Sequence, residues 1–264
     1  MHDEWIRTLD DTAAETRAKA RADLVAAGPA AIPPLLAALD TLGADGRREA
    51  ALALGELKAR DAVPALCALV EKEPYAIASW AAHALGLIGD PAATAVLAAK
   101  LRDDELRNAA AAGLALLGDA NAVPALTAAL APLGDRIDLG SYLGRYWIAR
   151  ALVRLGDRSP ASTSALEEVI DRDFGPSEQQ SWGSFRDDAV DLLVEARGAE
   201  ADAVLRPILK RERETLQLRY HVARLYWLRG ETSDALRVIF QRMARHPLYP
   251  AYAAEARDLL ATAH

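Results

Sequence analysis

The sequence predicts an all-α protein, a right-handed α-solenoid of about seven helical hairpins. One pattern occurs three times between Asp45 and Leu130: a helix with a small-residue stripe, a tight turn and a second apolar helix. The composition is 52% hydrophobic but only 6% aromatic, which is typical of closely packed alanine- and leucine-rich helices. The turns recur at intervals of 30, 31, 29, 38, 41 and 32 residues, at Gly28, Lys58, Gly89, Gly118, Gly156, Arg197 and Arg229. A period near 30 fits two short helices and two turns, and such hairpins bury their faces by stacking.

The elements follow the chain in order. Residues 3–9 are expected to form an opening helix, and 10–27 and 32–42 the first hairpin. Pro64 and Pro124 recur in DAVPAL and NAVPAL, where proline suits the first turn of a helix because those N–H groups have no intrahelical acceptor. Asp61 and Asn121, three residues earlier, are expected as N-caps.

These residues resemble a HEAT-repeat protein of the PBS lyase HEAT-like type. The likeness is carried by REAALALGELKARDAVPAL (48–66), WAAHALGLIGDPAATAVL (80–97) and NAAAAGLALLGDANAVPAL (108–126), with a fainter copy at 149–166. Residues 220–247 are similar to a tetratricopeptide repeat, through Tyr226, Gly230, Ala235 and Pro247. The resemblance implies a single domain over 1–264, with a cap at 1–11, HEAT-like repeats at 12–213, and a tetratricopeptide-like hairpin and closing helix at 214–264. It implies the fold but not one function, because such repeats serve as scaffolds in unrelated proteins.

The charge argues against a nucleic-acid groove. The net charge is −7; residues 1–140 hold 13 Lys/Arg against 20 Asp/Glu, and residues 141–264 hold 18 against 18. HEAT-like DNA glycosylases use tryptophans, an aspartate and arginine in a basic groove, and Trp182 with Asp187 and Asp188 is a faint echo of that arrangement. Phosphate neutralisation dominates affinity for DNA, so this function ranks third.

Catalytic and metal-binding patterns are absent from the sequence. The five histidines form no HExxH motif and no i, i+4 pair, whereas iron-binding HEAT-repeat hydroxylases use paired His-Glu motifs. Cys67 lies among apolar residues and is expected to be a buried thiol. We therefore expect no enzyme activity, no metal and no cofactor. No apolar run reaches about 18 residues, and the start of the chain has no apolar signal core, so we expect a cytoplasmic protein.

Two long intervals give the candidate binding site. They come from extra residues at 131–145 and 172–184, which we expect to be loops on one edge of the array. Loops on a rigid scaffold often bind partners, and aromatic residues and arginine dominate binding hot spots. The expected partner-binding residues are Tyr142, Arg145, Trp147, Trp182, Phe185 and Arg186. The alternatives are that these aromatics fill gaps between irregular repeats, or that partners occupy a concave groove lined by the second helices.

The sequence thus favours a non-catalytic protein-binding scaffold, adaptor or regulatory subunit. The alternative is a lyase-type or chaperone-like accessory protein that acts on a modified client. A protein or peptide partner is expected, while a membrane or nucleic-acid partner is not. The identity of the partner and the oligomeric state stay open.

Overall fold

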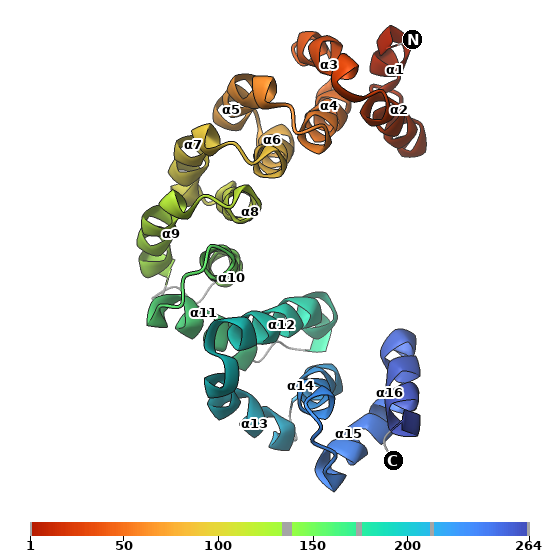
Figure 1. Cartoon of the computed structure of the whole chain (residues 1–264), viewed down its shortest axis with the longest axis vertical. Helices are drawn as coiled ribbons and strands as arrows, with labels where there is room; N and C mark the ends of the chain where they lie inside the picture. Colours follow the sequence, from red (N-terminus) through yellow and green to blue (C-terminus); the bar gives the residue numbers. More distant parts are fainter. Residues whose placement is uncertain (1, 134–138, 173–175, 212–213, 263–264) are drawn as a thin grey trace. The chain divides into compact units, whose positions relative to one another are not determined.

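The computed structural model describes residues 2–133, 139–172, 176–211 and 214–262, with the backbone but not the side chains at 139 and 176–183. Every regular element in these ranges is a helix, and consecutive helices pack as hairpins (Figure 1), which confirms the all-α solenoid. The chain divides into two compact units, Met1–Ser162 and Thr163–His264, each described on its own. The predicted single domain over 1–264 stays a prediction.

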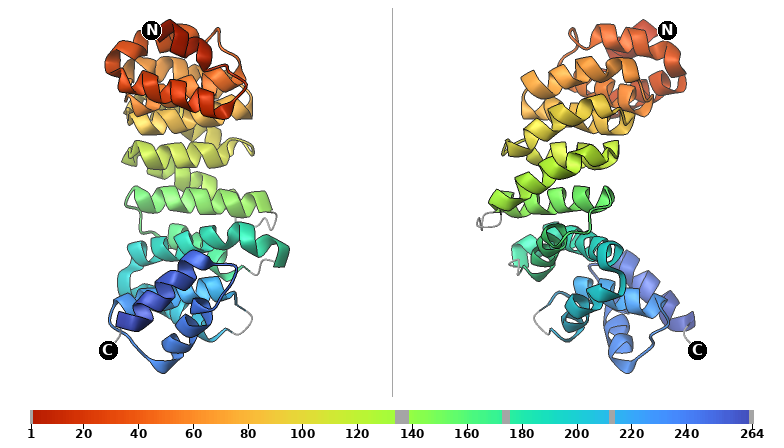
Figure 2. Two further views of the ribbon diagram at one scale, coloured as in Figure 1. Left: turned by 90° about the vertical axis from the view of Figure 1, so that its right-hand side faces the viewer. Right: turned by 60° about the vertical axis from the view of Figure 1, so that its left-hand side comes forward.

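The N-terminal unit, Met1–Ser162, arranges its hairpins as two rows of helices. The first helices of the hairpins form one row and the second helices form the other (Figures 1 and 2). An opening helix, α1 (His2–Thr8), packs against α2 and α3. The first helices are α2 (Ala14–Ala26), α4 (Ala44–Glu56), α6 (Tyr75–Ile88), α8 (Arg107–Leu117) and α10 (Leu139–Arg154). The second helices are α3 (Ile32–Ala38), α5 (Val63–Lys72), α7 (Thr94–Ala99) and α9 (Val123–Leu130).

Short 3-10 helices join several of these elements. They are η1 (Gly28–Ala31), η2 (Arg60–Ala62), η3 (Pro91–Ala93), η4 (Lys100–Arg102), η5 (Ala120–Ala122) and η6 (Ala131–Leu133). The unit boundary falls inside α11 (Pro160–Asp171).

The C-terminal unit, Thr163–His264, continues the same order of elements. After α11 come α12 (Pro176–Arg197), η7 (Gly198–Ala201), α13 (Asp202–Lys210), α14 (Leu216–Leu228), α15 (Asp234–Ala244) and α16 (Pro250–Thr262). α14 packs on α12 and α13, and α16 packs on α15. The expected hairpin at 220–247 and the closing helix are thus both helical, while the tetratricopeptide likeness stays a prediction.

Two ladders of buried leucines explain the period of the sequence. Each of the six hairpins that precede α14 places a fully buried leucine in its first helix and another in its second. The first-helix ladder is Leu24, Leu54, Leu85, Leu114, Leu152 and Leu193, and the second-helix ladder is Leu35, Leu66, Leu97, Leu126, Leu166 and Leu205. Burial of one leucine side chain stabilises a fold by about 1.5 to 3 kcal/mol relative to its exposure. The buried core therefore maintains the repeat, and the turns mark its period in the sequence.

The predicted turn positions are confirmed by the backbone. Gly28, Gly89, Gly118 and Gly156 all have positive φ, and so does Lys58, with φ of 54°. In the last two hairpins the residue with positive φ is Gly198 or Gly230, one position after the expected turn residues Arg197 and Arg229. A left-handed residue ends each first helix, because it turns the chain while satisfying the last carbonyls.

The predicted N-caps are wrong. Asp61 and Asn121 lie inside the 3-10 helices η2 and η5, which precede the second helices. The capping carboxylate comes earlier: Asp119 Oδ1 accepts a hydrogen bond from the Asn121 N–H at 3.0 Å, and Asp90 does the same for Ala92 at 3.0 Å. The sequence signal is a glycine followed at once by aspartate, because the aspartate begins the 3-10 turn directly after the left-handed residue.

The two expected loops are also wrong over most of their length. Residues 139–145 form the start of α10 and residues 176–184 form the start of α12. Residues 134–138 and 173–175 lie outside the described residues. The long intervals in the sequence therefore reflect first helices that are extended at their N-terminal ends, α10 with 16 residues and α12 with 22.

Candidate functional site

A series of arginines marks the start of the first helices. Arg17, Arg47, Arg107, Arg145 and Arg186 each stand eleven positions before a turn marker, at Gly28, Lys58, Gly118, Gly156 and Arg197, and Arg219 stands ten before Arg229. Five of them donate from their guanidinium groups to backbone carbonyls that precede the helix: Arg17 to Asp11 at 2.8 Å, Arg47 to Leu42 at 2.9 Å, Arg107 to Leu101 at 3.0 Å, Arg186 to Ile170 at 3.0 Å and Arg219 to Leu209 at 2.9 Å. These five arginines thus tie their first helices to the chain segment that precedes each of them.

Arg145 and Arg186 belong to this series. Both were predicted to bind a partner at an edge of the array, but their side chains are buried. Each is only 4% exposed. The Arg186 guanidinium also forms a two-pronged ion pair with Glu214, with N–O distances of 2.7 and 2.8 Å. Arg186 thus joins its helix to Ile170 and Glu214. The eleven-residue spacing in the sequence could have identified both arginines as buried, and a binding role for them stays a prediction.

The other predicted residues divide between the two units. In α10, Tyr142 is half-buried and lies under the Arg145 guanidinium, 4.5 Å from ring centroid to the guanidinium carbon. Trp147 is also half-buried and contacts Tyr146 and Arg150. In α12, Phe185 is half-buried, while the side chain of Trp182 lies outside the described residues. A binding role for Tyr142, Trp147, Trp182 and Phe185 stays a prediction.

A buried polar cluster joins α12, α14 and α16 in the C-terminal unit. Asp187 is 6% exposed; its Oδ2 accepts hydrogen bonds from Gln217 Nε2 at 2.7 Å and from the Tyr252 hydroxyl at 3.4 Å. Its Oδ1 is buried with no hydrogen-bond partner among the residues that the structure describes. His221 Nε2 lies 2.9 Å from Asp191 Oδ1. We call Asp187, Asp191, Gln217, His221 and Tyr252 the acid–histidine cluster.

Opposing effects set the pKa values in the acid–histidine cluster. Burial raises the pKa of Asp187 above its usual 3.8, although His221, Gln217 and Tyr252 lower it in part. Burial alone would lower the pKa of His221, but its hydrogen bond to Asp191 and the charges of Asp187 and Asp191 raise it above 6.5 overall. The cluster therefore favours protonated groups, and it lies in the packed contact of three helices.

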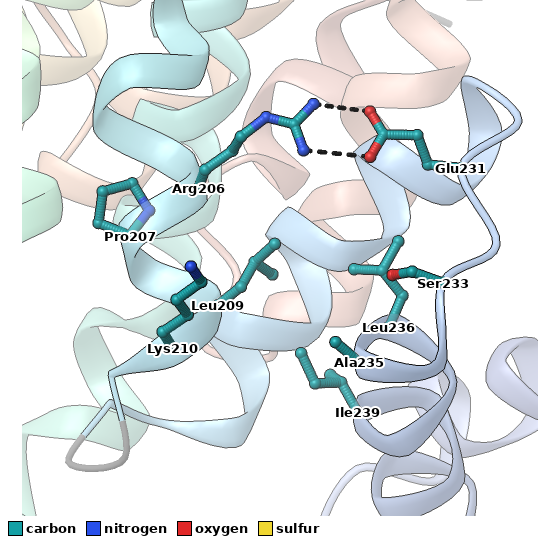
Figure 3. Close-up of a pocket in the computed structure, with 9 residues that line it drawn as sticks. All are labelled: Arg206, Pro207, Leu209, Lys210, Glu231, Ser233, Ala235, Leu236 and Ile239. Carbon is teal, nitrogen blue, oxygen red and sulfur yellow. Dashed lines mark hydrogen bonds and ion pairs between the residues drawn. The ribbon is translucent and has the colours of Figure 1, made fainter.

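A pocket of about 530 Å³ opens between α13 and α15 (Figure 3). Helix α13 lines it with Arg206, Pro207, Leu209 and Lys210, and the other wall consists of Glu231, Ser233, Ala235, Leu236 and Ile239. Leu236 and Ile239 are 3% and 2% exposed and form an apolar floor. We call this the α13–α15 pocket. Because α13 and α15 are consecutive second helices, the pocket lies on the row of helices that the sequence offered for the alternative site.

An ion pair bridges the two walls of the α13–α15 pocket. The Arg206 guanidinium donates to both carboxylate oxygens of Glu231, at 2.7 and 3.1 Å, and also to Asp202 at 3.2 Å. It lies over the Tyr226 ring, 4.3 Å from the centroid. Arg206 keeps its charge, since the hydrogen bond to Glu231 raises its pKa, and the same bond lowers the pKa of Glu231. The apolar floor with charged residues above it suits a side chain of another molecule.

Smaller hollows occur along the second helices of the N-terminal unit. One of about 390 Å³ lies between α7 and α9 and is lined mainly by alanines, with Arg102 at its edge. It lacks the bulky apolar floor of the α13–α15 pocket. Within the described ranges, no group of three or more His, Cys, Asp or Glu is arranged to hold a metal, and no helix has the length and apolar character needed to cross a membrane.

Comparison with known proteins gives matches at the level of repeats and of fold. A model of HEAT repeats matches residues 32–115, and a model of the PBS lyase HEAT-like repeat matches residues 106–132 and 144–172. No curated protein matches the sequence.

Among solved structures, one similar chain comes from the complex of CpcE and CpcF of phycocyanin lyase from Nostoc sp. PCC7120. It is 19% identical with a TM-score of 0.52, and the match covers 100% of this chain and 95% of that one. Human deoxyhypusine hydroxylase in complex with glycerol is 20% identical over 98% and 95% of the two chains, with a TM-score of 0.39. An engineered protein is 21% identical over 99% and 77%, also with a TM-score of 0.39.

The repeat models fall on the hairpins that the leucine ladders define, and the similarity to the phycocyanin lyase complex extends the same fold along the whole chain. The chain is therefore a HEAT-repeat protein, with repeats of the PBS lyase HEAT-like type.

Proposed function

We propose that this chain is an accessory protein of lyase type, which binds a protein client that carries or receives a covalent modification. The chain contributes recognition, and the bond-making chemistry resides elsewhere. The observation that carries the proposal is the α13–α15 pocket, whose apolar floor and charged rim suit a side chain of a protein. Its walls come from two consecutive repeats, so a partner bound there would contact both of them.

The type of repeat and the fold support a lyase-type accessory function. The repeats at 106–132 and 144–172 are of the PBS lyase type. The similar solved structure is a complex of two proteins, which supports a protein partner for this chain as well. We take the client to be a phycobiliprotein-like protein, and the modification to be a linear tetrapyrrole.

The experiment mixes the purified chain with an apo-phycocyanin subunit and free phycocyanobilin. Co-elution on size exclusion reports client binding, and the visible absorbance of the bilin reports a changed environment or a transfer. We expect the chain to co-elute with the subunit and to alter the bilin spectrum only when the subunit is present. If the chain neither co-elutes nor changes the spectrum, the lyase-type function is wrong.

Two variants test whether the pocket is the site. Ala235→Trp adds a bulky ring at the pocket mouth, where Ala235 is exposed. Gln241→Trp adds the same ring to an exposed position of α15 that is turned away from the pocket by the helical period. We expect only Ala235→Trp to abolish co-elution. Equal behaviour of the two variants would move the site away from α13 and α15.

A second candidate is a scaffold whose partner carries no chromophore, and the same pocket supports it. Affinity isolation from a nuclease-treated lysate distinguishes the two. A scaffold retrieves one colourless protein that the Ala235→Trp variant loses, whereas the lyase-type function predicts a bilin-bearing protein among the retrieved partners.

A further inference from the structure

We propose that the α13–α15 pocket recognises a protein segment that presents a large apolar side chain next to a carboxylate. The apolar side chain lies on the floor formed by Leu209, Leu236 and Ile239, and the carboxylate pairs with Lys210. This inference rests on the proposed function, and it adds the chemical class of the segment that is bound.

The floor of the pocket accepts an apolar group. Leu236 and Ile239 are almost completely buried, and Leu209 of α13 is half-buried and faces them (Figure 3). Pro207 and Ala235 are exposed at the sides and carry no charge. The volume of about 530 Å³ lies within the range of roughly 300 to 1,000 Å³ that is usual for ligand clefts. One aromatic or leucine side chain with its adjoining backbone fits such a space.

The charges at the rim select an anion. Arg206 and Arg229 are already matched by Glu231 and Asp202, so these four groups leave no net charge for a ligand. The neighbouring Arg211 is paired with Asp171, at 2.6 Å. Lys210 is exposed, lines the pocket and has no ion pair among the residues that the structure describes. It is therefore the cation that a carboxylate of the partner would meet.

A cationic segment would meet the opposite situation. Glu231 is the acidic residue that lines the α13–α15 pocket, and both its oxygens are held by Arg206. A lysine of a partner would have to displace that two-pronged pair while approaching Lys210. The charge complementarity therefore favours an acidic segment over a basic one.

The test uses three fluorescein-labelled peptides in anisotropy titrations at low salt. The first contains Gly-Ser-Phe-Leu-Asp-Asp-Ser-Gly, the second replaces both aspartates by lysine, and the third replaces Phe-Leu by Ala-Ala. The protein variants are Lys210→Glu and Lys72→Glu. Both are exposed lysines at the last position of a second helix, α13 and α5, so the two substitutions change the net charge equally.

We expect wild type to bind the first peptide about tenfold more tightly than either of the others. The second peptide lacks the carboxylates that pair with Lys210, and the third lacks the apolar side chains that fill the floor. Lys210→Glu should weaken that binding about fivefold to tenfold, and Lys72→Glu should leave it unchanged. Ala235→Trp should weaken it where Gln241→Trp does not. Equal affinity for the three peptides, or equal effects of Lys210→Glu and Lys72→Glu, overturns the inference.

The result is independent of the chromophore experiment, because no bilin or phycobiliprotein is present. A peptide preference without any bilin effect leaves the ligand class in place and removes the lyase-type role. A bilin effect without a peptide preference does the reverse.

Discussion

Tyr252 and Asp187 lie 65 positions apart in the sequence, yet the Tyr252 hydroxyl donates to Asp187 Oδ2 at 3.4 Å. The closing helix α16 is thereby joined to α12, and Gln217 of α14 donates to the same oxygen at 2.7 Å. The other oxygen of Asp187 is buried with no hydrogen-bond partner among the described residues. A carboxylate in this position is destabilised by the lost hydration, whereas a protonated carboxyl is not.

The stability of the C-terminal unit should therefore fall as the pH rises. Burial raises the pKa of Asp187 above 3.8, so the folded state retains a proton that the unfolded chain releases. His221, although burial opposes this, has its pKa raised above 6.5 by Asp191 and Asp187, so its stabilising charge is complete below pH 6.5 and is lost at higher pH. The Asp187 contribution is complete below pH 3.8 and is lost as the pH rises, and the His221 contribution makes the folded state more stable at pH 5.5 than at pH 8. Urea unfolding followed by circular dichroism at the two pH values checks this.

Two variants separate this cluster from other titrating groups. Asp187→Asn combined with His221→Gln should flatten the change in the urea midpoint between pH 5.5 and 8. His83→Gln in α6 is the control, because burial lowers the pKa of His83 and its contribution has the opposite sign. An unchanged pH dependence in the double variant would show that the acid–histidine cluster does not titrate as described.

Arg186 should be essential for stability. Its side chain is 5% exposed and that of its partner Glu214 is 10% exposed, so Arg186→Ala leaves the Ile170 carbonyl without its donor and the buried carboxylate without its cation, with the Thr215 N–H still donating to it. Breaking such a pair costs about 3 to 5 kcal/mol. The change in the free energy of unfolding, measured in urea, should reach this range, and Arg186→Met with Glu214→Met should recover much of it. A loss below about 1 kcal/mol would instead indicate that the pair is hydrated like a surface ion pair.

The sequence predicted the repeat well because the period has a local cause. Leu54, Leu85 and Leu114 are each fully buried and recur at the spacing of the turns, so the buried leucines and the turn residues indicate the same period. The arginine series was missed for a different reason. An arginine near an aromatic residue looks like a binding hot spot when the register is ignored, whereas the constant distance from the turn places Arg145 and Arg186 in a series whose members are largely buried.

The α13–α15 pocket was predicted only as a general groove along the second helices. Its form depends on tertiary contacts such as the ion pair of Arg206 with Glu231, 25 positions away, and no local pattern encodes that distance. The acid–histidine cluster was likewise invisible, because Asp187 and His221 stand on separate helices and share no motif. Contacts between different hairpins need the register of both, which a single sequence does not supply.

The close contact between α6 and α8 should be sensitive to the addition of one methyl group at Gly86. A Cβ added to Gly86 in α6 would lie 2.6 Å from the Gly113 carbonyl oxygen in α8, which is far inside van der Waals contact. Gly86→Ala should therefore destabilise the protein by about 1 to 3 kcal/mol through overpacking. Thermal unfolding provides the measurement. Alanine has the better helix propensity by about 1 kcal/mol, so a raised melting temperature would show that α6 and α8 separate easily.

Lys58 should be replaceable by glycine with a gain in stability. It is the described non-glycine residue with positive φ, at 54°, in the turn where the other hairpins of the N-terminal unit have glycine. A left-handed conformation costs an L-residue with a side chain roughly 1 to 2 kcal/mol, which Lys58→Gly should partly recover. The substitution also removes the hydrogen bond from the Lys58 ammonium to the Leu87 carbonyl, but that contact is exposed and contributes little.

Lys58→Ala is the matched control, because it loses the same hydrogen bond and keeps the strained backbone. We expect the melting temperature to rise for Lys58→Gly and not for Lys58→Ala; a fall in both would mean that the ammonium contact, and not the backbone, determines the choice of lysine here.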